Sequence, residues 1–371
     1  MVVKDTALRM NNTATLSVAF FPSAAALAGN PYWSILKDGL EAAGMTFVEP
    51  PDGRLLRWLR DTRRDPVVLH LHYVQQFYAY EGEQARLRWV LRLARNLVLA
   101  RLWGHRVVFT LHNLTPTYPL RPEWVDRLGH WVAANLSDSV IVHCRRAAEL
   151  LAETYGRRNS VHIVPHPHFI GIYPDTVSRE AARASLGYGP DEVALAFIGG
   201  VRPNKGIDRL LRVFRQVANP RLRLLIAGKP GPPPAHIDAL RAAAAGDPRI
   251  RLCLEFVPDD ELQLYYRAAD AVVLPFARIL TSGSAMLAMS FGRAVIVPRM
   301  GCLAELPGNA VIHYEPGDDE ALARVLEGLN GQDLHGKGLG ALAVARSKTH
   351  EEFIAGTLAA YQNRHNGSEG S

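Results

Sequence analysis

Short apolar runs alternate with helix-like segments along almost the whole chain, and this alternation constrains the fold more than any other feature. The first series of apolar runs lies at 16–21, 66–73, 106–112, 139–144 and 161–166. A second series lies at 193–200, 222–228, 250–256, 270–276 and 293–298. Apolar strands separated by helices are typical of parallel sheets covered on both faces.

The restart of the pattern indicates two domains, as does a length of 371 residues. We expect an α/β chain with two doubly wound, Rossmann-like domains that face a central cleft, and ligands at the carboxyl ends of the strands. The expected segments are a first domain, a linker rich in Pro, Gly and Tyr, a second domain, and a final helix that crosses back to the first domain. Their expected bounds are 14–172, 173–190, 191–345 and 346–366.

The N-terminal segment permits two interpretations. Lys4 and Arg9 precede an apolar stretch and then small residues, which is compatible with a signal peptide. We favour a first buried strand over "TLSVAFF", because the later apolar runs resemble its partners. The sequence has no apolar run of about 18 residues or more, so we expect no transmembrane helix.

The three cysteines, Cys144, Cys253 and Cys302, are far apart in the sequence and have no ligand-like spacing. This spacing argues against a disulfide framework and against a zinc site. It also favours a reducing compartment. We therefore expect a cytoplasmic protein.

The stretch "FIGGVRPNKGIDRLL" leads from an apolar strand through Gly199 and Gly200 into a loop and then a helix. Arg202 and Lys205 lie beside the start of that helix, which already carries partial positive charge. Such a loop suits a diphosphate, because its backbone N–H groups and both cations can bind phosphate oxygens. It lacks the endings of a P-loop and of the GxGxxG dinucleotide motif. A turn with two solvated cations is the alternative.

A second connection between a strand and a helix contains Ser282, Gly283 and Ser284. Small residues rich in donors at a helix N-terminus form an anion-binding site. The alternative is an ordinary serine N-cap. Two such loops in one domain favour a diphosphate ligand.

These stretches resemble the nucleotide-binding domain of GT-B glycosyltransferases, nearest to glycosyltransferase family 4, also called group 1. "FIGGVRPNKGIDRLL" is similar to the family's loop in which an Arg and a Lys hold the donor diphosphate. Residues 254–276 resemble the stretch in which backbone near Val257 meets the base. Residues 287–306 and 315–329 resemble the rest of that domain, and the resemblance is weaker in the first half of the chain.

The resemblance implies a metal-independent transfer of a sugar, with retention, from a UDP- or GDP-sugar to a glycan or lipid-linked acceptor. It places the reaction in cell-surface polysaccharide or glycolipid synthesis and implies no cofactor besides the nucleotide sugar. It makes Gly200, Arg202, Lys205 and the Ser282–Ser284 loop the diphosphate site. Arg202 and Lys205 also become catalytic candidates, because they would stabilise the charge that grows on the leaving diphosphate.

One departure concerns two glutamates that the family carries eight positions apart. Ile279 and Leu287 occupy these positions here, the second of them beside the expected nucleoside site. Neither side chain accepts a hydrogen bond, so recognition of the ribose and the sugar must be supplied otherwise. Four alternatives to a retaining transferase stay open: an inverting transferase, an epimerase, a phosphorolytic enzyme, and an inactive glycan- or nucleotide-binding partner of a membrane assembly.

The first half offers candidates for sugar and acceptor binding. His112 and Asn113 end the apolar run "FTLH". The resemblance implies a histidine that faces the donor sugar, where a neutral imidazole can bond a hydroxyl or act as a base. Gly29 and Asn30 follow the first strand, in a loop that helps hold sugar and acceptor in the family. The alternatives are a satisfied strand-end histidine and an ordinary loop before a helix.

Two histidine pairs suggest a metal site at first sight. His70 and His72 share one face of a strand, and His166 and His168 flank a proline. No carboxylate or third histidine stands at ligand spacing nearby. We therefore favour structural or substrate-contact roles and expect no bound metal.

Positive charge is concentrated in the first half of the chain. Residues 1–170 hold 20 Lys+Arg and 14 Asp+Glu, whereas 171–371 hold 22 of each. Segments 54–64 and 84–106 interleave arginines with Leu, Val and Trp, which is typical of a helix at an anionic membrane surface. A half-buried helix with an arginine rim is the alternative. Nucleic acid is not expected, because no stacking platform or recognition motif is present.

Overall fold

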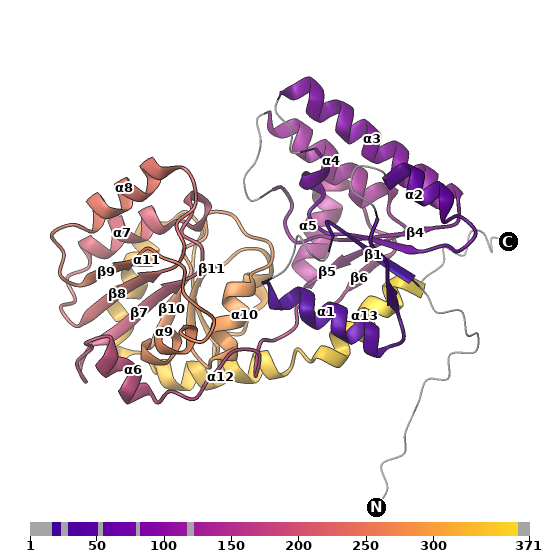
Figure 1. Ribbon diagram of the computed structural model, residues 1–371. Coiled ribbons are helices and arrows are strands. Elements are labelled where there is room, and N and C mark those ends of the chain that lie inside the picture. Colours follow the sequence, from indigo (N-terminus) through magenta and orange to yellow (C-terminus); the bar gives the residue numbers. More distant parts are fainter. Residues whose placement is uncertain (1–16, 24–28, 51–54, 79–81, 117–121, 363–371) are drawn as a thin grey trace, which may run out of the picture.

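The computed structural model describes residues 17–23, 29–50, 55–78, 82–116 and 122–362. The chain forms two lobes, each built on a six-stranded parallel sheet with helices on both faces (Figure 1). The predicted α/β architecture of two doubly wound domains is confirmed. The expected strand over "TLSVAFF" is present as β1, while residues 1–16 lie outside the described part.

The N-terminal lobe has the strand order β2-β1-β3-β4-β5-β6. Its strands are β1 (Ser17–Phe21), β2 (Thr46–Phe47), β3 (Val68–Leu71), β4 (Arg106–Thr110), β5 (Ser139–Val142) and β6 (Val161–Ile163). Its helices are α1 (Pro31–Ala42), α2 (Leu55–Asp61), the 3₁₀ turn η2 (Val74–Phe77), α3 (Glu83–Leu102), α4 (Glu123–Leu136) and α5 (Arg145–Tyr155). Strands β3 and β5 are buried at every position, which explains why their sequences lack polar alternation.

The C-terminal lobe has the order β12-β11-β10-β7-β8-β9. Its strands are β7 (Val193–Ile198), β8 (Leu222–Ala227), β9 (Ile250–Cys253), β10 (Ala271–Val273), β11 (Ala294–Pro298) and β12 (Val311–Tyr314). Its helices are α6 (Arg179–Ser185), η3 (Pro203–Lys205), α7 (Ile207–Gln216), α8 (Pro234–Ala244), α9 (Leu262–Ala268), α10 (Gly283–Ser290), η4 (Gly301–Glu305), α11 (Asp319–Glu327), η5 (Gly328–Gly331) and α12 (Leu334–Arg346).

The last helix, α13 (His350–Gln362), runs from the C-terminal lobe back under the N-terminal lobe (Figure 1). The ring of Phe353 packs against Tyr32 of α1, with 5.2 Å between centroids. The hydroxyl of Tyr361 lies 2.7 Å from Nδ1 of His70 on β3. The end of the chain therefore stabilises the sheet of the first lobe.

A disulfide joins the two lobes, so the prediction that the cysteines form none is wrong. Cys144 precedes α5 and Cys302 lies in η4, and their Cα atoms are 5.6 Å apart. The spacing argument failed because it considered neighbours in sequence, whereas the fold brings together residues 158 positions apart. The inference of a reducing compartment rested on the absence of a disulfide, so it is no longer supported.

Other contacts reinforce the junction between the lobes. Leu280 of the second lobe is buried in the hydrophobic core of the first. Its backbone N–H donates to the side-chain oxygen of Asn113 at 3.4 Å. The backbone N–H of Arg146 donates to the carboxylate of Glu305. The lobes are thus held in one arrangement on the side where the loops after β4 and β10 meet.

Candidate functional site

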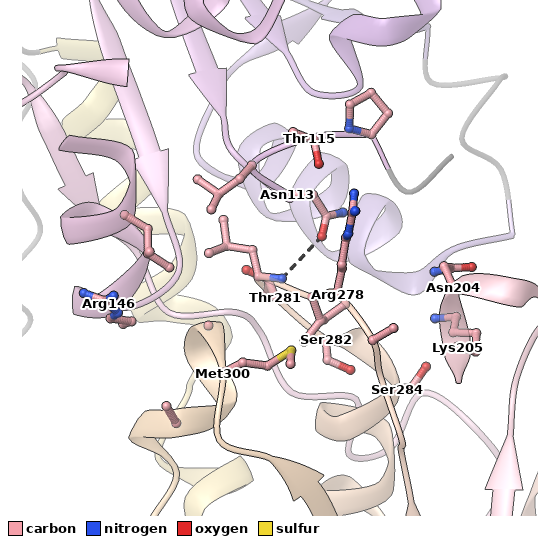
Figure 2. Close-up of a pocket in the computed structure, with 18 of the residues that line it drawn as sticks. Asn113, Thr115, Arg146, Asn204, Lys205, Arg278, Thr281, Ser282, Ser284 and Met300 are labelled. Atoms are coloured by element: carbon pink, nitrogen blue, oxygen red, sulfur yellow. Dashed lines mark hydrogen bonds between the residues drawn. The ribbon is translucent and has the colours of Figure 1, made fainter. Parts of the chain in front are cut away.

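A cavity of about 880 Å³ lies between the lobes at the carboxyl ends of both sheets. From the N-terminal lobe it is lined by Asn113, Leu114, Thr115, Pro116, Glu123, Arg146 and Leu150. From the C-terminal lobe it is lined by residues 203–205, 277–284, 299–301 and 304. Figure 2 shows Lys205 and Ser284 on one side of this cavity and Arg146 on the other. Open parallel sheets bind ligands at such a place.

Lys205 reaches the cavity because the loop after β7 makes one tight turn. Residues 203–205 form η3, and Gly206 then adopts a left-handed conformation with φ of +71° before α7 begins. A Cβ at residue 206 would stand 2.0 Å from the carbonyl oxygen of Pro275, so only glycine fits there. This glycine lets the loop after β7 lie directly against the loop after β10.

In the described part of the chain, the ammonium group of Lys205 contacts an aromatic ring instead of a carboxylate. Its Nζ lies 4.9 Å from the centre of the Phe276 ring, and within the described residues it has no carboxylate partner. Burial, followed by the charge of Arg202, lowers the pKa of Lys205 to about 8. A partly buried cation without a carboxylate is favourable for binding an anion, because the anion supplies the missing charge.

Arg202 and Gly200 lie together at the edge of this loop. The side chain of Arg202 is exposed, and its Nε lies 3.3 Å from the point where a Cβ on Gly200 would stand. Neither residue lines the cavity itself, whereas Lys205 does. Arg202 therefore adds positive charge from the outer side of the loop.

The start of α10 faces the same region. Ser282 caps the helix, since its Oγ accepts from the N–H of Ala285 at 3.1 Å. Ser284 Oγ lies 3.7 Å from the position of a Cβ on Gly199, so the two predicted loops meet in space. Ser282, Gly283 and Ser284 all line the cavity. Serine capping and anion binding are compatible here, because the cap uses only one of the free backbone donors.

Of the residues expected at the nucleoside and at the two glutamate positions, only one lines the large cavity. Val257 is buried, and Leu287 packs against the core of the C-terminal lobe. Neither lines the large cavity. Ile279 does line it, so an apolar side chain lies where the family resemblance implies a carboxylate.

His112 is packed within a group of aromatic rings rather than opening into the cavity. Its neighbours within about 6 Å between ring centroids are Tyr32, Trp33, Tyr73, His72 and His143. Burial, and then the neighbouring histidines, lower the pKa of His112 well below its ordinary value. The ring is therefore neutral at physiological pH and can accept or donate a hydrogen bond, but it does not line the cavity that holds Lys205.

The remaining predicted residues of the first lobe divide between two places. Asn113 lines the large cavity, and its side-chain oxygen accepts the hydrogen bond from Leu280 that Figure 2 marks. Gly29 and Asn30 instead line a separate cavity of about 370 Å³, together with Tyr173 and Asp259. Asn30 also caps α1 by accepting from Tyr32 N–H at 3.1 Å.

Sequence reasoning missed several cavity residues. Arg278 stands four positions before Ser282 in the same connection, so its charge was a signal that could have been used. Arg146, Arg299, Thr115 and Glu123 also line the cavity. Thr115 follows the predicted Asn113 by two positions, whereas Arg146, Arg299 and Glu123 come from separate parts of the chain, where no local pattern distinguishes them from surface residues.

The histidines considered for metal binding serve other roles. His70 is buried and lies 2.7 Å from the hydroxyls of both Tyr361 and Thr110. Nδ1 of His166 lies 2.8 Å from the carbonyl oxygen of Pro167, and its Nε2 faces Gly283 at the start of α10. Within the described ranges, no group of three or more His, Cys, Asp or Glu side chains is arranged to hold a metal ion.

The basic segments form the outer helices of the N-terminal lobe (Figure 1). On α3, the exposed residues include Arg88, Leu91, Arg95 and Leu102. Trp124 and Trp131 are exposed on the neighbouring α4. Among the described helices, none has the length and apolar character needed to cross a bilayer.

Two facing Rossmann-like lobes, with a cationic loop pair at the cavity between them, define a GT-B architecture. Solved structures agree in fold. Sucrose-phosphate synthase from Thermosynechococcus elongatus aligns with a TM-score of 0.69 at 19% identity, over 94% of this chain and 98% of that chain. Anabaena HepE, solved in complex with UDP, also aligns with a TM-score of 0.69, at 17% identity over 93% of this chain and 100% of that chain.

Sequence comparison is more specific. Residues 192–330 match the family model of glycosyl transferases group 1. A GDP-mannose:glycolipid 4-beta-D-mannosyltransferase of Xanthomonas campestris is 30% identical over 79% of this chain and 78% of its own length. A D-inositol 3-phosphate glycosyltransferase of Mycobacterium sp. (strain KMS) is 32% identical over 54% of this chain and 48% of its own. The chain belongs to the group 1 glycosyltransferases, and it is a GT-B hexosyltransferase of the family 4 type.

Proposed function

We propose that this glycosyltransferase transfers a hexose from a GDP-sugar to a lipid-linked glycan in cell-surface polysaccharide or glycolipid synthesis. The observation that carries this proposal is the convergence of Lys205 and the start of α10 on one interlobe cavity. A GDP donor and a glycolipid acceptor are supported by the relative that shares 30% identity over 79% of this chain, because its name states both. A UDP-sugar is the alternative donor, since the Anabaena neighbour was solved in complex with UDP-glucose.

Lys205 and the first N–H groups of α10 act on the leaving group, and Arg202 adds positive charge from the edge of the loop. Cleavage of the bond between the sugar and the diphosphate leaves negative charge on the diphosphate. A cation and helix dipole placed there bind the charged leaving group more strongly than the intact donor, and this difference lowers the barrier. These residues provide the charge stabilisation without a metal ion, and we propose metal-independent chemistry.

Retention is the stereochemical outcome that the family resemblance implies. Inversion is a second candidate, and it is favoured by the apolar side chains of Ile279 and Leu287 at the family's glutamate positions. An inverting enzyme needs a base for the acceptor hydroxyl. Among the described residues that line the cavity, Glu123 is the one carboxylate. Neutral His112 directly precedes Asn113 but does not line the cavity. NMR of the product's anomeric centre separates the two outcomes.

We propose that the enzyme works at an anionic membrane surface. The exposed arginines and leucines of α3, with Trp124 and Trp131 on α4, form one outer surface that combines positive charge and apolar side chains. Each Lys or Arg near an anionic bilayer contributes about 1 kcal/mol, and exposed Trp inserts at the headgroup level. Such a surface suits an enzyme whose acceptor is anchored in lipid.

The test is turnover with defined donors. GDP-mannose and UDP-glucose are each incubated with the protein and with bacterial lipid extract, and both nucleoside diphosphate release and the extracted glycolipid are measured. We expect release of GDP together with a glycolipid that has gained one hexose. Release of GDP without a lengthened acceptor would contradict transfer to lipid, and binding of GDP without any turnover would support a non-catalytic role.

A further inference from the structure

The charges around the large cavity are not evenly compensated. Arg146 is paired with Glu149 at 2.8 Å and with Glu153 at 3.1 Å on its own helix. Arg299 lies 3.5 Å from Glu315. Lys205 and Arg278, in contrast, have no carboxylate partner in the described part of the chain. Among its described lining residues, the cavity therefore presents two cations without an ion-pair partner, Lys205 and Arg278, and one carboxylate, Glu123. One diphosphate site accounts for Lys205.

Arg278 points away from the diphosphate loops. It follows β10 in the C-terminal lobe, and Figure 2 shows its guanidinium extending toward Asn113 and Thr115 of the N-terminal lobe. Lys205 and Ser284 lie on another side of the cavity in the same view. A group bound by Arg278 would therefore face the opposite lobe rather than the helix start that serves the donor.

Asn113 completes a set of donors at this position. Its side-chain oxygen is occupied by the N–H of Leu280, so its NH₂ group is left to face the cavity. The amide, the guanidinium and the hydroxyl of Thr115 then all present hydrogen atoms to one region. A planar guanidinium beside an amide donor suits the two oxygens of a carboxylate or of a phosphate.

We propose that Arg278 and Asn113 form a second anion site, which binds a carboxylate or phosphate of the acceptor. The inference rests on the proposed function, because it assigns the donor diphosphate to Lys205 and the acceptor to the N-terminal lobe. The acceptor is thus an anionic glycan or glycolipid. The anion is either a uronic acid carboxylate close to the reacting hydroxyl or the phosphate that links the glycan to its lipid.

The test measures binding to protein saturated with GDP, which blocks the donor site. One arm compares methyl glucuronide with methyl glucoside, and the other compares geranyl diphosphate with geraniol, each by saturation-transfer NMR titration. Arg278→Gln removes the charge. Asn113→Asp keeps the oxygen that accepts from Leu280 but replaces the NH₂ donor with a negative oxygen. Arg324→Gln, on α11 and outside the cavity, is the control for loss of one exposed arginine.

In at least one pair, we expect the native protein to bind the anionic ligand about tenfold or more tightly than its neutral counterpart. This ratio is what hydrogen bonds to a charged group typically contribute. Arg278→Gln and Asn113→Asp should remove that preference and leave GDP affinity unchanged, and Arg324→Gln should change neither. The arm that shows the preference identifies the anion as carboxylate or phosphate. A preference absent from the native protein, or retained in Arg278→Gln, would overturn the second site. Failure of GDP to bind the native protein would instead refute the proposed function.

Discussion

The lowered pKa of Lys205 leads to a prediction that separates a catalytic cation from a structural one. Its fall from the ordinary 10.5 to about 8 corresponds to about 3 kcal/mol of unfavourable free energy for the charged form, caused by burial and then by Arg202. Below pH 8 the side chain is charged and can stabilise the leaving diphosphate. As pH rises above 8 it loses its proton in the free enzyme, so kcat/KM should fall about tenfold per pH unit.

Two substitutions test this reasoning in a coupled assay for GDP release. Lys205→Ala should lower kcat/KM by about 10²–10³-fold at pH 7, on the scale of single oxyanion-hole donors. Lys205→Arg should keep partial activity and lose the fall above pH 8, because a guanidinium stays protonated. Lys337→Ala, which removes a partly exposed lysine of α12 outside the cavity, is the matched control.

Stability gives an independent readout. Because the pKa of Lys205 is lower in the folded than in the unfolded chain, its charge opposes folding at pH 7, and this opposition disappears as pH rises from about 8 towards 10.5. Lys205→Ala should therefore melt at the same or a higher temperature than the native protein at pH 7. A variant with native kcat/KM, or one that loses activity because it unfolds, would refute the assignment.

The disulfide, an ion pair, the membrane surface and metal independence each give a further prediction. Reduction with dithiothreitol should destabilise the native protein by roughly 2–5 kcal/mol in urea denaturation and leave the stability of Cys302→Ser unchanged. Asp126→Asn should cost about 3–5 kcal/mol in the same assay, because Arg86 would stay buried without its carboxylate, now 2.8 Å away. Replacing Leu102 and Trp131 by serine should weaken sedimentation with phosphatidylglycerol vesicles but not turnover of a soluble acceptor. EDTA should leave turnover unchanged, and a loss restored by added Mg²⁺ would contradict metal independence.

Local patterns predicted most of the elements, because parallel strands buried on both faces leave a clear trace in sequence. Helical spacing is equally clear in α7, where Ile207, Leu210, Leu211 and Phe214 lie on one stripe and are all buried. The pattern did not reveal β2, which has two residues, or the strand Val311–Tyr314. Half of β12 is only partly buried, so its apolar signal is weak.

The candidate site was predictable only where one connection supplies it. Lys205 and the Ser282–Ser284 loop each lie at a strand-to-helix bend, and parallel strands bring such bends to one edge. Whether His112 opens to that edge depends on packing within its own lobe, where Tyr32, Tyr73 and His143 surround its ring, and no local pattern encodes these contacts. Distance along the chain therefore limited the prediction more than residue chemistry did.

The apolar residues at positions 279 and 287 explain why the lobe junction matters for specificity. A glutamate binds sugar hydroxyls directionally, whereas Lys205 binds charge with little directional preference. Without those carboxylates, we expect directional contacts to the donor sugar from the hydroxyls of Ser282 and Ser284, while Asn113 and Thr115 of the opposite lobe face the acceptor. Transfer between a donor held by one lobe and an acceptor held by the other requires the two lobes to keep a fixed spacing. The disulfide and the burial of Leu280 hold the lobes together, so we expect them to maintain that spacing.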